Sequence, residues 1–268
     1  MSDASPSQRA TSWLAAFEKA LASGHPNQVT ALFDGDCFWR DLVSFTWNIK
    51  TQEGHQAIAD MLSSCLNNVK PSQFALKEDA TEADGVVDAW FTFETAVARG
   101  LGHVRLKGDK AWTLLTTMTE LKGFEEKKGP KRIKGAEHGA HKHRKSWLEL
   151  RKEEQETLGY TEQPYVLIVG GGQGGIMLAA RLRRLGVPTI VVEKNARPGD
   201  SWRNRYKSLC LHDPVWYDHL PYLPFPDDWP VFAPKDKVGD WLEMYTKVME
   251  LNYWGSTTAK KATFDEAT

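Results

Sequence analysis

Residues 1–124 combine the hydrophobic spacing of helices with that of strands. Apolar residues recur at helical intervals over residues 12–22, where Gly24 ends the pattern, and again over residues 55–69. A short helical stretch around residues 29–33 lies between them and is followed by CFWRDLVSFTW, a segment rich in strand-forming residues. This order predicts two helices, a strand and a third helix.

The rest of this region alternates apolar and polar positions. VVDAWFTFETAV, LGHVRLK and AWTLLTTMTEL follow one another and are separated by turn residues. Alternation of this kind predicts an antiparallel sheet with one solvated face. We therefore expect residues 1–124 to form an α+β domain.

From residue 163 the pattern becomes that of an α/β unit. VLIV at residues 166–169 is a continuous apolar run, which predicts a central parallel strand buried on both faces. GGGQGG comes next, then an amphipathic helix over residues 174–185 that Gly186 ends, and a second strand, TIVVE. Strand, helix and strand in this order predict a Rossmann-type fold.

The glycines of GGGQGG form a G-x-G-x-x-G pattern, and each has a physical task. Gly170 permits a tight turn, Gly172 lets the backbone approach a pyrophosphate, and Gly175 lets the helix pack on the strand. The N-terminus of the helix presents N–H groups and a positive dipole end to phosphates. The segment is therefore predicted to bind a dinucleotide.

Glu193 ends the second strand, 18 residues after Gly175. At this place a carboxylate can accept hydrogen bonds from ribose hydroxyls, and it would repel a 2′-phosphate. These residues disfavour NADP at this site and leave FAD and NAD open.

The connecting segment, residues 125–162, is predicted to be a solvated basic linker that ends in a helix over SWLELRKEEQETLGY. From Lys122 to Lys152 the chain holds eleven Lys and Arg residues against four Glu. A basic surface against cofactor phosphates is the alternative interpretation. His138, His141 and His143 fit no common zinc spacing, so no metal is expected.

Composition excludes several classes of function. Of the 268 residues, 41% are hydrophobic and the net charge is −1, which favours neither nucleic-acid binding nor attachment to an acidic membrane. The three cysteines are Cys37, Cys65 and Cys210; their odd number and wide spacing disfavour a disulfide framework and favour a cytoplasmic location. No signal peptide or apolar run of membrane-spanning length is present.

After Glu193 the chain enters a long segment rich in proline and aromatic residues, rather than the short loop of a simple NAD dehydrogenase. The segment contains GDSW, then RYKSLCLHDP, then LPYLPFPDDWPVFAPKDKVGDWLEMY. Together with GGGQGG and Glu193, these motifs resemble the flavin-containing monooxygenases, a class that includes the indole-pyruvate monooxygenases. The resemblance spans about residues 165–255.

This resemblance implies FAD as the cofactor and carries binding roles to particular residues. The ADP half of FAD would contact the glycine turn and Glu193, and the flavin half would lie near two residue pairs. The cofactor-binding residues expected on this basis are Gly170, Gly171, Gly172, Gln173, Gly174, Gly175, Glu193, Ser201, Trp202, His212 and Asp213. Asp213 also has a plain interpretation as a turn residue before Pro214.

The order of elements in residues 1–124 resembles the NTF2-like (SnoaL-like) cone fold, whose members include enzymes with an Asp or His inside the cone. The residues available for such a role are Asp34, Asp36, Asp41, His55 and His103. Turn, cap and surface positions are the plain interpretation of all of them, and Asp41, near Trp39, is the one that warrants inspection. A homodimer through this domain is a further expectation.

The reaction that the flavin resemblance implies begins with reduction of FAD by NADPH. Reduced flavin captures O2 as a C4a-hydroperoxide and transfers one oxygen atom to a small organic substrate. The family's second G-x-G-x-x-G, which binds NADPH, has no counterpart in this sequence. We therefore expect the N-terminal part of a longer enzyme, inactive alone, and no residue is assigned a catalytic role.

Two other functions stay open at this point. The NTF2-like half can be the working part, as a non-catalytic dimerisation or small-ligand module with a vestigial flavin segment. An NAD-dependent dehydrogenase is the third hypothesis, and the GDSW and LHDP segments argue against it.

Overall fold

The computed structural model describes residues 4–135, 139 and 143–266. The chain divides into two compact units, Met1–Glu125 and Glu126–Thr268, and each is described by itself. Of the helices within the described ranges, none is both long and apolar enough to cross a membrane.

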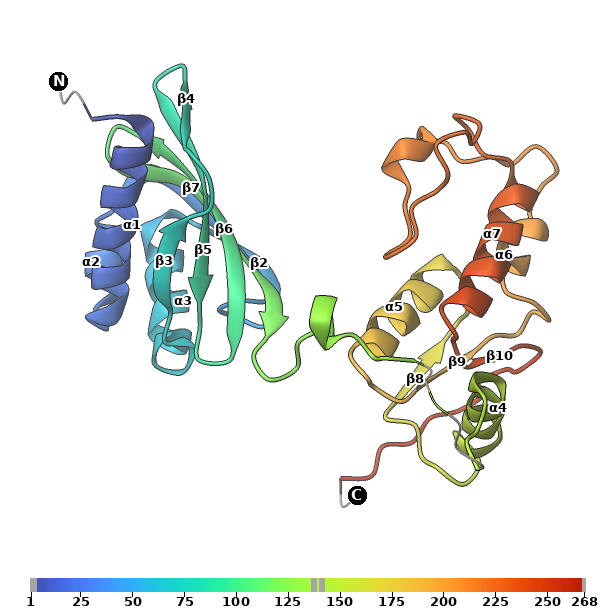
Figure 1. The fold of residues 1–268 in the computed structure, drawn as a ribbon. Helices are drawn as coiled ribbons and strands as arrows, with labels where there is room; N and C mark the ends of the chain where they lie inside the picture. Colours follow the sequence, from blue (N-terminus) through green and yellow to red (C-terminus); the bar gives the residue numbers. More distant parts are fainter. Residues whose placement is uncertain (1–3, 136–138, 140–142, 267–268) are drawn as a thin grey trace. The chain divides into compact units, whose positions relative to one another are not determined.

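The first unit is built from helices on one face of a mixed sheet (Figure 1). Its sheet has the order β2-β1-β7-β6-β5-β3, with β4 paired to β5; β1 and β7 run parallel, and the other pairs are antiparallel. The elements in chain order are α1 (Pro6–Ala22), α2 (Pro26–Thr30), β1 (Phe33–Leu42), β2 (Ile49–Glu53), α3 (Gly54–Val69), β3 (Ser72–Leu76), β4 (Thr81–Ala83), β5 (Val86–Glu94), β6 (Ala98–Lys107) and β7 (Lys110–Leu121).

The predicted alternation along β5 is present. Val87, Ala89, Phe91 and Phe93 are buried under the helices, and the residues between them lie on the other face. Helix α1 begins six residues earlier than predicted because Ser5 caps it: the Ser5 hydroxyl accepts from the N–H of Gln8, and the Gln8 side chain accepts from the N–H of Ser5.

The second unit contains a small parallel sheet of order β10-β9-β8. This is the 3-2-1 order of half a Rossmann fold. The elements in chain order are η1 (Gly129–Lys131), α4 (Trp147–Thr157), β8 (Val166–Val169), α5 (Gln173–Arg184), β9 (Thr189–Val192), α6 (Asp200–Arg203), η2 (Val215–Tyr217), α7 (Lys235–Val248) and β10 (Tyr253–Trp254).

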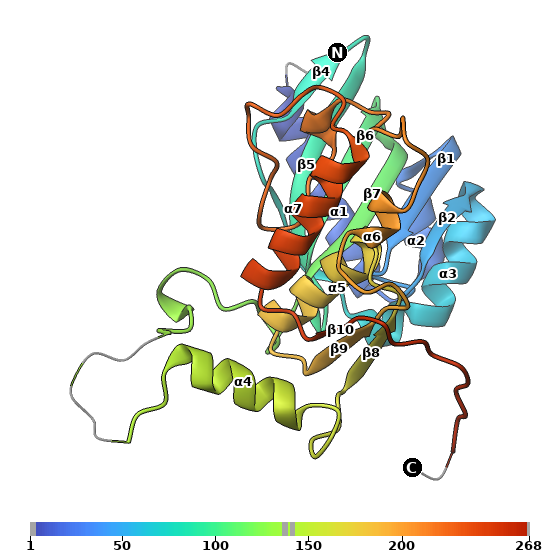
Figure 2. The ribbon, with the colours of Figure 1, turned by 90° about the vertical axis from the view of Figure 1, so that its right-hand side faces the viewer.

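The two faces of this sheet are covered unequally. Ile168 and Val191 pack under α5 and α7, whereas Ile190 and Val192 pack against Leu158 at the end of α4. Figures 1 and 2 show α4 on the side of the sheet opposite α5.

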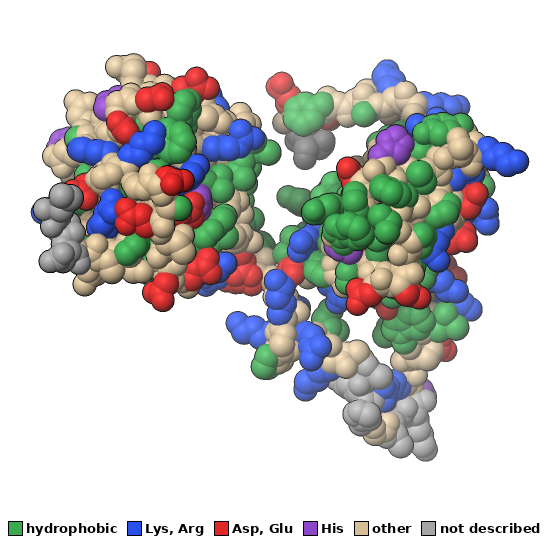
Figure 3. Space-filling view, turned by 90° about the horizontal axis from the view of Figure 1, so that it is seen from above, with side chains coloured by type: hydrophobic (Ala, Val, Ile, Leu, Met, Phe, Trp, Pro, Cys, Tyr) green, Lys and Arg blue, Asp and Glu red, His purple; other side chains and the backbone are tan. Residues whose placement is uncertain are grey.

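The prediction that β8 is a central strand buried on both faces is wrong. Strand β8 forms an edge of the described sheet, and Leu167 and Val169 are 56% and 68% exposed. The cover that Leu158 supplies lies over β9 and β10, so the same face of β8 stays open. Hydrophobic side chains also gather on the face of the second unit seen in Figure 3.

The segment that we expect to be a solvated basic linker ends in the predicted helix, and this helix is bonded to the second unit. Residues from Glu126 onward belong to the second unit, and α4 is fastened to it. Glu154 accepts from Arg183 of α5 at 2.8 Å and from the side chain of Asn252 at 3.0 Å, and Arg151 is buried beside it. Helix α4 is therefore a structural part of the α/β unit.

Candidate functional site

The glycine turn between β8 and α5 has the geometry that its sequence predicts. Gly170 has a φ of +105°, a conformation that favours glycine. A Cβ on Gly175 would lie 2.0 Å from the carbonyl oxygen of Gly170, so the first turn of α5 rests directly on the end of β8. Gly172 is the N-cap of α5 and supplies no side-chain cap, which leaves N–H groups of the first turn for an anion.

Glu193 closes this turn from the end of β9. Its carboxylate is buried and accepts three hydrogen bonds: Oε2 from the N–H of Gly171 at 2.7 Å, and Oε1 from the N–H and the side-chain amide of Asn195 at 2.9 and 2.7 Å. A carboxylate offers roughly four acceptor positions, so one is left for a ligand hydroxyl. Glu193 therefore holds the glycine turn and keeps acceptor capacity beyond these three bonds.

The GDSW motif lies beside the same turn. Gly199 approaches α7 so closely that a Cβ there would lie 2.1 Å from the carbonyl oxygen of Gly239. The indole N–H of Trp202 donates to Oε1 of Gln173 at 3.0 Å, which joins α6 to the start of α5. The Ser201 hydroxyl is buried, has no hydrogen-bond partner among the described residues, and lies 3.9 Å from the place of a Cβ on Gly172.

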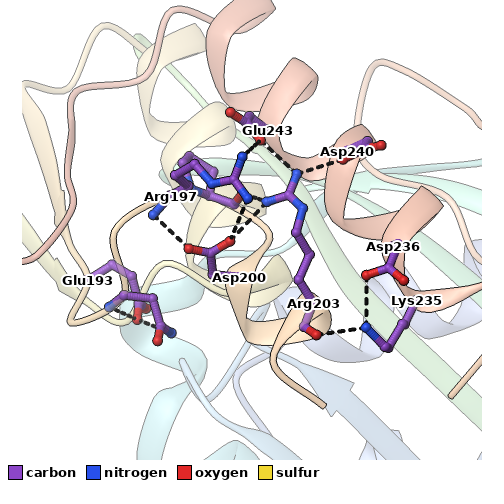
Figure 4. A network of polar contacts seen from close by, with 10 residues as sticks. Glu193, Arg197, Asp200, Arg203, Lys235, Asp236, Asp240 and Glu243 are labelled. Atoms are coloured by element: carbon purple, nitrogen blue, oxygen red, sulfur yellow. Dashed lines mark hydrogen bonds and ion pairs between the residues drawn. The ribbon is translucent and has the colours of Figure 1, made fainter. Parts of the chain in front are cut away.

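Arg203 fixes the orientation of α6, a role that sequence analysis missed (Figure 4). Its guanidinium donates to the carboxylates of Asp200, Asp240 and Glu243 at 3.1, 2.8 and 2.6 Å, and Lys235 donates to its carbonyl oxygen at 2.7 Å. Burial disfavours the charged form, but these hydrogen bonds outweigh it and raise the pKa of Arg203. The signal in the sequence is the spacing of Asp200 and Arg203, one helical turn apart.

His212 and Asp213 stand apart from the residues around the turn. Both are exposed, on a segment that is held on each side by backbone hydrogen bonds from Leu211 to Ala233 and from Val215 to Val231. Within the described residues their side chains make no hydrogen bond or ion pair. The other nine expected binding residues surround the glycine turn, from Gly170 to Gly175 with Glu193, Ser201 and Trp202.

In the first unit, Asp41 is fully buried and serves as a cap for the turn that follows β1. Its carboxylate accepts from the N–H groups of Ser44, Phe45 and Thr46 and from the hydroxyls of Thr46 and Thr116. Five donors fill the acceptor capacity of this carboxylate. The plain interpretation of Asp41 as a turn residue therefore fits the structure.

The other acid and histidine candidates of this unit are dispersed. Nε2 of His55 lies 2.8 Å from the backbone oxygen of Asp34, and Nε2 of His103 lies 2.6 Å from Oδ1 of Asp88. Asp36 is exposed. His138 and His141 lie outside the described residues, and the rest of the described chain holds no cluster of three metal-ligating side chains.

The first unit also carries an open polar groove of about 490 Å³ between the β1–β2 connection, β2 and α3. Its lining includes Thr46, Lys50, Gln52 and Asp60. Thr46 connects it to the buried Asp41 turn.

Three comparisons relate the chain to known proteins. A family model described as "FAD binding domain" matches residues 163–208. Indole-3-pyruvate monooxygenase YUCCA1 of Oryza sativa subsp. japonica is 36% identical over 105 residues, which are 39% of this chain and 26% of that protein. The uncharacterized oxidoreductase CzcO-like of Geobacillus kaustophilus is 37% identical over 86 residues, 32% of this chain and 25% of that protein. The chain thus spans about a quarter of the length of these curated relatives.

Solved structures give matches of two kinds. The flavin-containing monooxygenase from Stenotrophomonas maltophilia is 28% identical and covers 33% of this chain and 27% of its own, with a TM-score of 0.31. An NTF2-like protein of unknown function from Cytophaga hutchinsonii is 11% identical and covers 41% of this chain and 88% of its own, with a TM-score of 0.29.

Proposed function

We propose that this chain binds FAD and is part of an FAD- and NADPH-dependent monooxygenase, because its second unit matches an FAD-binding family model and resembles parts of flavin-containing monooxygenases. The observation that carries the proposal is the glycine turn, which Glu193 clamps through the N–H of Gly171. The substrate class is a small organic molecule, oxidised with O2 as the co-substrate. A homodimer through the first unit belongs to the same proposal.

The residues present fit a dinucleotide. The N–H groups at the start of α5 and its positive dipole end would hold the pyrophosphate. The remaining acceptor position of Glu193 would take a ribose hydroxyl. The buried hydroxyls of Ser201 and Tyr253 lie beside this turn, have no hydrogen-bond partner among the described residues, and would donate to ligand oxygens.

The residues of this chain bind and orient, and the cofactor supplies the redox chemistry when bound. Trp202 and Gln173 join the GDSW helix to the phosphate end of the site, and Arg203 keeps that helix against α7. His212 and Asp213 would contact the flavin half, as the family resemblance implies. No acid–base step is assigned to a side chain.

The experiment that tests this proposal is titration of the purified 268-residue chain with FAD, followed by flavin absorbance and fluorescence. We expect a perturbed flavin spectrum and saturable binding. Glu193→Ala should weaken FAD binding by about 1–3 kcal/mol, since it removes charged hydrogen bonds at the turn. A free-flavin spectrum throughout the titration of a folded sample would contradict the proposal, and preferential binding of NAD would favour a dehydrogenase instead.

A second function has one observation in its favour, the polar groove of the first unit. A small-ligand module would use that groove, with Lys50 and Asp60 as its charged groups. Retention of a small molecule by Lys50→Ala at wild-type levels would argue against this alternative.

A further inference from the structure

Tyr253 is the residue of β10 that lies against the glycine turn. It pairs with Val191 of β9, and its ring joins the apolar cluster under α5 and α7. A Cβ on Gly171 would lie 2.4 Å from the hydroxyl oxygen of Tyr253. The tyrosine side chain therefore reaches past β9 to the turn that Glu193 clamps.

The hydroxyl of Tyr253 is buried and has no hydrogen-bond partner in the described part of the chain. Buried hydroxyls are normally paired, because an unpaired one loses its bonds to water without replacement. Tyr245 of α7 shows the usual arrangement: its hydroxyl donates to the carbonyl oxygen of Pro221 at 2.8 Å. A phenylalanine would fill the place of Tyr253 without this cost.

The surroundings keep this hydroxyl a donor. Burial, and then the negative charges of Glu193 and Asp200, raise the pKa of Tyr253 above its ordinary value. The carboxylate of Glu193 is engaged by Gly171 and Asn195, and that of Asp200 by Arg203 and the N–H of Arg197. Within the described residues the proton of the Tyr253 hydroxyl is thus left without an acceptor.

Among the described residues, a second unpaired hydroxyl lies near the next glycine of the turn. Ser201 of α6 lies beside Gly172, as Tyr253 of β10 lies beside Gly171. The two hydroxyls come from separate elements and lie near consecutive glycines of the turn. That arrangement suits a ligand with several acceptor oxygens, which is the character of a nucleoside diphosphate.

We propose that Tyr253 is a cofactor-binding residue whose hydroxyl donates a hydrogen bond to an oxygen of the ADP half of the dinucleotide, while its ring supports Gly171. The inference rests on the proposed FAD binding. It adds a residue outside the glycine motif and outside the segments that resemble the flavin-binding motifs, on a strand of two residues.

The test compares Tyr253→Phe with Tyr245→Phe in the whole chain, using ADP and FAD as probes in calorimetric titrations and thermal unfolding without ligand. Tyr253→Phe should weaken the binding of ADP and of FAD by the same factor, roughly 5- to 100-fold. Without ligand, this variant should be as stable as the wild-type chain or more stable. Tyr245→Phe should do the reverse, lowering the unfolding temperature without changing ADP affinity.

The outcomes of these titrations distinguish the role of Tyr253 from the proposed binding of FAD. Unchanged ADP affinity in Tyr253→Phe, with a wild-type chain that binds ADP and FAD, overturns the role of Tyr253 alone. Weaker FAD binding with unchanged ADP binding in Tyr253→Phe also overturns it, because the hydroxyl would then act on another part of FAD. A drop in unliganded stability like that of Tyr245→Phe would overturn it too, by showing a partner in the free chain. A wild-type chain that binds neither probe overturns both proposals.

Discussion

Asp41 in the first unit and Glu193 in the second are both buried carboxylates that accept hydrogen bonds from the backbone of a turn, yet they differ in their surroundings. Five donors converge on Asp41, and one of them, the Thr116 hydroxyl, accepts in turn from the indole N–H of the buried Trp39. Three donors bind Glu193, beside a helix N-terminus without a side-chain cap. The first arrangement closes a fold, and the second leaves capacity for a ligand.

An unpaired hydroxyl is not sufficient to mark a site. The Ser44 hydroxyl, in the turn that Asp41 caps, is also buried and has no hydrogen-bond partner in the part of the chain that the structure describes. Near Glu193, two such hydroxyls from different elements lie close to consecutive glycines at the N-terminus of α5, which has no side-chain cap. Convergence of separate elements therefore distinguishes a binding site from a local irregularity.

The largest effect that we expect comes from Asp41→Ala. It leaves buried N–H and hydroxyl donors of one turn unpaired, which should cost about 3–5 kcal/mol of unfolding free energy in the first unit. Urea unfolding followed by tryptophan fluorescence measures this loss. The exposed Asp36→Ala is the matched control and should change the free energy by less than about 0.5 kcal/mol.

Asp41→Ala also tests the contrast between the two carboxylates. FAD affinity should stay at the wild-type value, since Asp41 is saturated by its own turn. A large loss of FAD affinity without unfolding would show that the two sites are not independent and would break the comparison.

The features of the two units that depend on local sequence patterns are predictable from the sequence. Helices α1, α3 and α5 follow from periodicity, and the glycine turn follows from its motif. The exposed face of β8 does not follow, because burial of Leu167 depends on which segments cover the sheet. Four apolar residues in a row look the same in a central strand and in an edge strand.

The remaining differences between prediction and structure arise from contacts distant in sequence. Thr116, one of the donors to Asp41, lies 75 residues away along the chain. Tyr253 reaches Gly171 through the register of a strand of two residues, which carries no periodic signal. Arg203 is recognisable in the sequence only as a neighbour of Asp200, and its bonds to α7 require the fold.

The second prediction concerns the close contact at Gly175. In Gly175→Ala the new Cβ would meet the carbonyl oxygen of Gly170 at 2.0 Å, so α5 must move away from the turn. We expect a loss of about 1–3 kcal/mol of stability and at least tenfold weaker FAD binding. Gly174→Ala, whose Cβ would meet open space, is the control for folding and should be neutral or up to about 1 kcal/mol more stable. Equal stability of the two variants would contradict the packing role of Gly175.

The smallest effect belongs to Glu154, which binds α4 to the second unit. Burial raises its pKa, but hydrogen bonds from Arg183 and Asn252 and the nearby arginine charges outweigh this, and the net pKa lies below the ordinary value of 4.5. A carboxyl group with a lowered folded pKa stabilises the fold above its ordinary pKa, and this contribution is lost as the pH falls through the folded value. About a third of the side chain is exposed, so we expect about 1 kcal/mol or less.

Denaturant unfolding of the second unit between pH 7 and pH 3 measures the contribution of Glu154. The wild-type chain should lose stability below about pH 4.5, and Glu154→Gln should lose less over the same interval because it has no proton to take up. The exposed Glu156→Gln should follow the wild-type curve. Parallel curves for wild type and Glu154→Gln would mean that α4 is not held by this carboxylate. The geometry of the glycine turn around Glu193 would then not depend on the attachment of α4 through Glu154.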